Sequence, residues 1–248
     1  MKDEKRVGTG IVWTIYTLAM AFAVYGFLAL QVQIYRESGQ YYCMLDCMHK
    51  LAAPWDFGLF YLPVTSGYIL MNRKAYQYAG FVIRYHRIEE AWKAAFRELA
   101  VRSGLCSGIY SIISCLFSWL STYEVTNWET ENSIFGQVNG GIYEGSPAVV
   151  ILAFFIFNFI KTFLAVLFLV LLEIWCKGLI QGYLVLGTIM VVEWCSEDVG
   201  IFLNLFCIKY GNFRFPWTVW LLIGGGSLLI LGAYLTGRNV WKDKEFYE

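Results

Sequence analysis

The stretch Pro147–Leu172, PAVVILAFFIFNFIKTFLAVLFLVLL, decides the fold class. It runs for 26 residues with Lys161 as its single charged residue. An α-helix needs about 20 apolar residues to cross a bilayer. The stretch therefore predicts a membrane-spanning helix, with enough residues to tilt or to extend beyond the hydrocarbon core.

The composition of the whole chain agrees with this prediction. Of the 248 residues, 58% are hydrophobic and 15% are charged, against roughly 45–50% and about 25% in soluble domains. This excludes a disordered chain, a collagen-like chain and an ordinary cytosolic enzyme. We expect an all-α polytopic membrane protein, built as a single transmembrane domain over residues 1–248. The formal net charge is zero, so no nucleic-acid partner is expected.

Six apolar runs predict six spans, and the first is too long to be a signal-peptide core. The second run is short and contains Pro63, and only Glu173 and Lys177 separate the fourth run from the fifth. The predicted spans are about 10–32, 57–71, 103–120, 147–172, 178–194 and 217–235.

The distribution of basic residues predicts the orientation of these spans. Six spans place both termini and residues 73–102 on one side, which then holds 14 of the 19 Lys and Arg residues. The other side holds four, and Lys161 lies inside a span. Because basic residues accumulate on the cytoplasmic side, we expect a multi-pass protein of the plasma membrane with both termini in the cytoplasm.

Residues 73–102 predict an amphipathic cytoplasmic helix between the second and third spans. From Phe81 onward, apolar residues recur at helical spacing and basic residues fill the gaps. The apolar stripe comprises Phe81, Ile88, Trp92, Phe96 and Leu99. Periodicity alone leaves two interpretations open: a helix lying on the inner leaflet, and a docking element for a soluble partner.

The stretch FVIRYHRIEEAWKAAFRELAVRSGLCSGIYSIISCLF, residues 81–117, resembles a segment of ABC-2-type transporter permeases of Gram-positive bacteria. The matching pieces are Ile83-Arg84-Tyr85, Trp92-Lys93, Arg102-Ser103 and Tyr110-Ser111. The order of spans and loops resembles that family along the whole chain. Glu89-Glu90 and the loops at 33–54 and 122–147 do not match its pattern.

This resemblance implies the transmembrane half of an ATP-binding-cassette exporter, paired with a second permease. We expect a homodimer, although the sequence leaves open whether the second permease is identical. A separate cytoplasmic ATPase would bind ATP and Mg²⁺, since this chain contains no Gly-Lys dipeptide and so no Walker-A loop. No cofactor is expected on this chain. The resemblance implies ATPase coupling through Arg84, Tyr85, Arg87, Ile88, Glu89, Trp92 and Phe96.

Two other kinds of site fit the sequence less well. Glu89-Glu90 is similar to the E-E-x-x-x-R signature of CAAX-protease-like intramembrane enzymes, but Ala94 occupies the Arg position and the later spans contain no His. No catalytic residue is therefore expected. Cys43, Asp46, Cys47 and His49 form a possible metal cluster on the outside, since Cys and His are good soft ligands, but a single C-x-x-x-C favours a polar loop without a metal. The positions of the seven Cys residues favour free thiols over a disulfide framework. A disulfide between Cys43 and Cys47, or between Cys195 and Cys207, stays open.

Lys161 is the residue of the fourth span that calls for a functional explanation. It follows Asn158 by three residues, so the two share a helix face. An ionisable group inside a span is costly and normally faces a cavity or a partner, whereas a lysine near a span end extends to the interface. Both interpretations stay open, and Asn158 and Lys161 are candidate substrate-pathway residues.

The function expected from these observations is the export of an amphipathic or lipophilic substrate, such as a peptide, a bacteriocin or an antibiotic, by an ABC permease. The alternative is an accessory or interaction membrane protein outside that class.

Overall fold

The computed structural model describes residues 2–71, 87–176, 179–195, 202–207, 209–215 and 217–242. Within these ranges the regular structure is helical, and the one β-type contact is an isolated bridge between Tyr41 and Ser133. Arg84 and Tyr85, two of the predicted coupling residues, lie outside the described residues.

Four long helices dominate the described part of the chain. They are α1 (Lys2–Glu37), α6 (Ile88–Thr122), α8 (Pro147–Cys176) and α11 (Trp217–Lys242). Each contains a stretch that is long and apolar enough to cross a membrane. The chain is therefore an all-α membrane protein.

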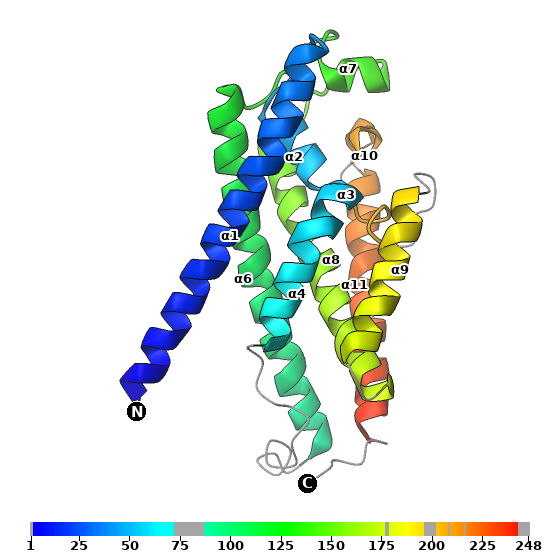
Figure 1. Ribbon diagram of the computed structural model, residues 1–248. Coiled ribbons are helices and arrows are strands. Elements are labelled where there is room, and N and C mark those ends of the chain that lie inside the picture. Colours follow the sequence, from blue (N-terminus) through cyan, green and yellow to red (C-terminus); the bar gives the residue numbers. More distant parts are fainter. Residues whose placement is uncertain are drawn as a thin grey trace.

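Shorter helices complete the bundle. One pass is assembled from α3 (Pro54–Asp56), the π-helical turn η1 (Phe57–Tyr61) and α4 (Leu62–Met71), and another is α9 (Leu179–Cys195). The remaining short helices are α2 (Met44–Leu51), α7 (Ile134–Asn139) and α10 (Tyr210–Arg214). These three lie in the half of the molecule opposite the start of α1 (Figure 1).

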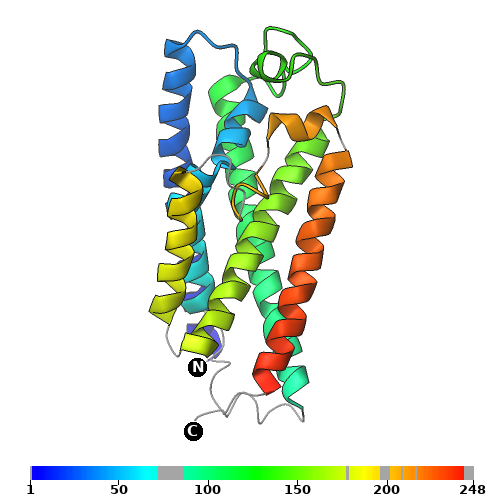
Figure 2. The same ribbon diagram turned by 90° about the vertical axis from the view of Figure 1, so that its right-hand side faces the viewer.

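Successive passes along the chain alternate in direction. α1, α6 and α9 run one way, and α4, α8 and α11 run the other (Figures 1 and 2). The start of α1 and the end of α11 consequently lie at the same end of the bundle, and the first half of α1 diverges from the other helices.

The described residues do not provide six helices of spanning length. The predicted spans 57–71 and 178–194 correspond to η1–α4 and to the 17-residue α9, both shorter than the ~20 residues that cross a bilayer. Pro63 explains the irregular first case, since it has no N–H to bond the carbonyl of Leu59. The N–H of Leu62 instead bonds the carbonyl of Phe57, which closes the π-helical turn.

The prediction of a separate coupling helix before a span at 103 was wrong. α6 is one helix of 35 residues from Ile88 to Thr122. Ser103, at the expected boundary, is buried in the middle of this helix. The amphipathic segment is thus the first part of a long bundle helix.

α8 forms the centre of the bundle and packs against α2, α4, α6, α9 and α11. Its most apolar 18-residue stretch is 61% buried, compared with 22% for that of α1 and 11% for that of α11. The helix that carries Asn158 and Lys161 is therefore the one most enclosed by protein.

Candidate functional site

Lys161 lies entirely inside the protein. Its side chain is 0% exposed, and its Nζ donates a hydrogen bond of 3.0 Å to the carbonyl oxygen of Ala52. The same Nζ lies 3.7 Å from the ring centroid of Phe57, a favourable position for a cation over an aromatic face. The ammonium group is thus held by the segment that joins α2 to η1, and it does not reach the protein surface.

The sequence around Pro54 explains why the Ala52 carbonyl is free to accept this bond. α2 ends at Leu51, and the last carbonyls of a helix have no partner within the helix. The ring of Pro54 then provides no N–H donor to the preceding turn. The thiol of Cys207 also donates to this oxygen, at 3.4 Å. One carbonyl therefore joins α8 to the segment 202–207.

Glu193 fixes the other side of the segment 202–207. Its side chain is 2% exposed. Its carboxylate accepts the backbone N–H groups of Phe202 (2.6 Å), Leu203 (2.7 Å) and Asn204 (3.2 Å). A buried carboxylate is stabilised when several N–H groups bond to it. The segment 202–207 is consequently held between an acidic residue of α9 and the Lys161–Ala52 contact.

Asn158 supplies a second polar group on the face of Lys161. It is 0% exposed, and neither its Nδ2 nor its Oδ1 bonds to another described residue. A buried amide without a partner is costly. Since such an amide offers both a donor and an acceptor, it can bind a polar group of a ligand at this position.

A group of hydroxyls extends the polar interior from α8 to α6 and η1. The hydroxyls of Tyr61 and Ser107 are 3.3 Å apart, and Thr162 Oγ1 lies 3.3 Å from that of Tyr61. Tyr16 and Thr65 form a similar contact of 2.9 Å between α1 and α4. Hydrogen bonds of this kind join helices inside a membrane.

A separate buried cluster surrounds Asp46 in α2. Its Oδ1 accepts the Nε1–H of Trp128 (2.8 Å) and the hydroxyl of Tyr210 (3.0 Å). Its Oδ2 accepts the backbone N–H of Cys43 (2.8 Å). Burial raises the pKa of Asp46, although these donors oppose the shift. The cluster joins α2, the 123–133 segment and α10, so its role is to hold the loops together.

Cys43, Cys47 and His49 form no metal site with Asp46. No group of three or more His, Cys, Asp and Glu side chains is arranged to hold a metal ion in the described ranges. Both cysteines are buried free thiols. His49 instead stacks on Tyr210, with ring centroids 4.1 Å apart.

The burial of His49 makes the stability of the fold sensitive to acid. Burial, with Lys50 and Lys209 nearby, lowers the pKa of His49 from 6.5 to about 3. Between these values the unfolded chain binds the proton and the folded chain does not, so stability falls as the pH falls. From pH 7 to pH 5 we expect His49 to remove about 1–2 kcal/mol of the free energy of unfolding.

The measurement is thermal unfolding in detergent at pH 7 and pH 5, compared with His49→Gln. The raised pKa of Asp46 acts in the opposite direction and is common to both proteins. A wild-type and a variant protein with the same pH dependence would contradict this role of His49.

Three of the predicted coupling residues, Trp92, Phe96 and Glu89, contact α11 within the chain itself. Trp92 is fully buried, and its Nε1 donates to the carbonyl of Tyr234 at 2.9 Å. Its ring lies 5.4 Å from that of Trp241 and against the backbone of Gly237. The Trp92 side chain is consequently enclosed between α6 and α11.

Phe96 and Glu89, two further predicted coupling residues, also contact α11. Phe96 packs on Phe163 and Tyr234, with ring centroids 5.0 and 4.9 Å away. Glu89 forms ion pairs of 2.7 Å with Arg238 and 2.9 Å with Lys242. Ile88 is partly buried against the core, and Arg87 is exposed. Trp92 and Phe96 are therefore packed inside the protein, because α11 ends beside the start of α6.

Sequence reasoning missed Glu193 and the hydroxyls around Tyr61. Glu193 lies in the fifth apolar run, and an acidic residue inside such a run is a signal for function or for structural pairing. The acceptor on Ala52 had no signal in the sequence, because any residue type offers a carbonyl.

Comparisons with known proteins gave no match to a family model, to a curated protein or to a solved structure.

Proposed function

We propose that the chain is the permease subunit of an ATP-driven exporter. The observation that supports this proposal is the burial of Lys161 and Asn158 at the centre of a bundle of apolar helices. Ionisable residues inside membrane helices are rare because they are costly, and they commonly mark transport pathways. The resemblance of residues 81–117 to ABC-2-type permeases is the reason for proposing an ATP-driven exporter rather than another class of transporter.

The chemistry around Lys161 suggests an amphipathic or lipophilic substrate. The ammonium group would attract an anionic or carbonyl group of the substrate, and the free amide of Asn158 would bind a peptide-like group. The surrounding α8 surface is apolar and would receive hydrophobic side chains. A peptide, a bacteriocin or an antibiotic combines these properties.

The partner ATPase would bind at the end of the bundle where α1 starts and α11 ends. We place this end in the cytoplasm because 14 of the 19 basic residues then lie inside. With Trp92 buried, the ATPase would contact the exposed polar side of α6. That side comprises Arg87, Glu90, Lys93 and Arg97. A second copy of the chain would complete the pathway.

Lys161→Leu tests this proposal. The variant and the wild type are expressed with a candidate ATPase subunit, and ATP-dependent efflux of a fluorescently labelled amphipathic peptide is measured in membrane vesicles. We expect efflux by the wild type and a loss of roughly tenfold or more in Lys161→Leu, equivalent to about 1.4 kcal/mol in the transport step. Lys209→Leu, which changes an exposed lysine, should transport normally.

An accessory membrane protein is the second candidate, and one observation favours it. Lys161 is already bonded to Ala52 and lies over Phe57, so it can act as a structural brace. Wild-type vesicles that show no ATP-dependent efflux would favour this candidate. Normal efflux by Lys161→Leu would support the transport function but show that Lys161 is not part of the substrate pathway.

A further inference from the structure

A second feature of the molecule, unrelated to Lys161, is a pocket of about 520 Å³ between α1 and α6. Its volume lies in the range of pockets that hold small molecules, about 300–1,000 Å³. Its lining includes Leu28, Ala29, Val32, Arg36, Glu37 and Phe117. It belongs to the end of the bundle opposite the start of α1.

The pocket changes from apolar to polar along the axis of α1. Leu28 and Val32 form its buried wall, at 2% and 8% exposure, and Phe117 and Leu120 face them from α6. From Gln33 onward the lining contributed by α1 is polar, and it ends with the last turn of that helix. This gradient matches an amphiphile whose chain lies along the helices and whose headgroup lies at the boundary of the membrane.

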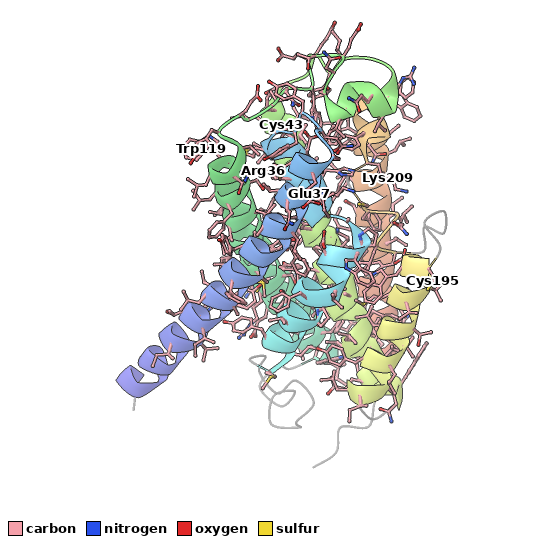
Figure 3. All side chains as sticks on the ribbon, turned by 45° about the horizontal axis from the view of Figure 1, so that its top comes forward. Arg36, Glu37, Cys43, Trp119, Cys195 and Lys209 are labelled. Carbon is pink, nitrogen blue, oxygen red and sulfur yellow. The ribbon has the colours of Figure 1, made fainter. Side chains whose placement is uncertain are left out.

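Two opposite charges occupy the polar end of the pocket. Arg36 and Glu37 are adjacent and both line it, and they lie together at the end of α1 (Figure 3). The Nε of Arg36 donates to the hydroxyl of Tyr42 at 3.3 Å, which orients the guanidinium group. Glu37 Oε1 accepts a hydrogen bond of 2.8 Å from Gln33. The polar end of the pocket therefore offers one cationic and one anionic side chain.

Tyr123 is held at the mouth of the pocket by its backbone. Its φ is +58°, the only positive value among the described residues that are not glycine, and such a conformation is costly for a bulky side chain. Its N–H donates to the carbonyl of Trp119 at 2.7 Å, and the next residue, Glu124, accepts the N–H of Met44 at 3.0 Å. The ring remains 80% exposed, where an aromatic side chain contacts lipid headgroups favourably.

We propose that this pocket binds one molecule of phosphatidylethanolamine from the adjacent leaflet. The phosphate contacts the guanidinium of Arg36, and the ammonium group contacts the carboxylate of Glu37. One acyl chain lies against Leu28, Val32 and Phe117. The choice of this headgroup follows from the charges, because phosphatidylglycerol has no cation for Glu37 and phosphatidylcholine has no N–H to donate. The inference is independent of the proposed transport function.

The test uses the full chain in nanodiscs with equal amounts of phosphatidylethanolamine, phosphatidylglycerol and phosphatidylcholine. After release into detergent, native mass spectrometry counts the lipid molecules retained by each chain. We expect the wild type to retain one phosphatidylethanolamine molecule. Ala29→Trp, which fills the pocket, should abolish retention, and Leu30→Trp, one residue away on the exposed side, should not.

Charge variants separate the two headgroup contacts. Arg36→Gln should reduce the retention of phosphatidylethanolamine by about tenfold, equivalent to about 1.4 kcal/mol, whereas Arg214→Gln in α10 should leave it unchanged. Glu37→Gln should remove the preference over phosphatidylglycerol. Equal retention of the three lipids by the wild type, or unchanged retention in Ala29→Trp, would show ordinary surrounding lipid and overturn the proposal. A wild-type preference for phosphatidylglycerol or phosphatidylcholine would also overturn it.

Discussion

Gly237→Ala is expected to destabilise the protein strongly although it adds a single methyl group. A Cβ at this position would overlap the indole of Trp92, which is 0% exposed and cannot move aside. Forcing extra volume into a packed core typically costs about 1–3 kcal/mol. For a chain of this size, that lowers the midpoint of thermal unfolding by roughly 2–4 °C for each kcal/mol.

Gly232→Ala on the same helix is the matched control, because a Cβ there meets no atom within 4 Å. It should leave the midpoint unchanged or raise it, since Ala favours the helix over Gly. The measurement is the fraction of monodisperse protein in detergent after heating. Equal midpoints for the two variants would show that α6 and α11 do not pack as described, and would reopen the role of Trp92 in ATPase binding.

Asp46→Leu is expected to have the second large effect. The change removes one acceptor from Trp128, one from Tyr210 and one from the N–H of Cys43. Each buried donor left without a partner costs about 1–3 kcal/mol. We therefore expect a loss of about 3 kcal/mol or more in the free energy of unfolding, together with exposure of the buried thiols.

The rate at which Cys43 and Cys47 react with a thiol reagent reports this loss locally. Both thiols are buried, and burial raises the pKa of Cys47 to about 12, so the native protein should react slowly. Asp46→Asn should lie between the wild type and Asp46→Leu, because the amide keeps an acceptor oxygen. Asp56→Leu, which changes a half-buried carboxylate outside the cluster, should react like the wild type. Slow labelling of Asp46→Leu would refute the importance of the cluster.

The sequence predicted the class of fold correctly and its coarse plan in part. Runs such as Pro147–Leu172 are apolar enough that only a membrane helix explains them, and the structure has a 30-residue helix there. The number of spans was harder to predict, because hydropathy does not reveal the π-helical turn before Pro63. The start of the third span was missed because no helix breaker separates the amphipathic segment from the apolar one, and so α6 continues through both.

The candidate site could be predicted only for residues that are unusual in themselves. Lys161 was identifiable because a charge inside an apolar run is costly, and Asn158 because it shares that face. Their surroundings depend on contacts distant in sequence, such as the 109-residue separation between Lys161 and Ala52. Trp92 is a different case. Its helical periodicity correctly indicated that the side chain is buried, but only the three-dimensional structure shows that α11 covers it.

The contact between Lys161 and Ala52 bears on how the chain enters the membrane during synthesis. A lysine at the centre of an inserting helix costs about 2.5–3.5 kcal/mol at the translocon. The carbonyl of Ala52 belongs to a segment made before α8, so the acceptor precedes the donor when domains form from the N-terminus onward. Glu193 and Cys207 are synthesised after Lys161, so the contact between Lys161 and Ala52 can form without them. The order of the residues along the chain thus lowers the barrier to inserting the most central helix of the bundle.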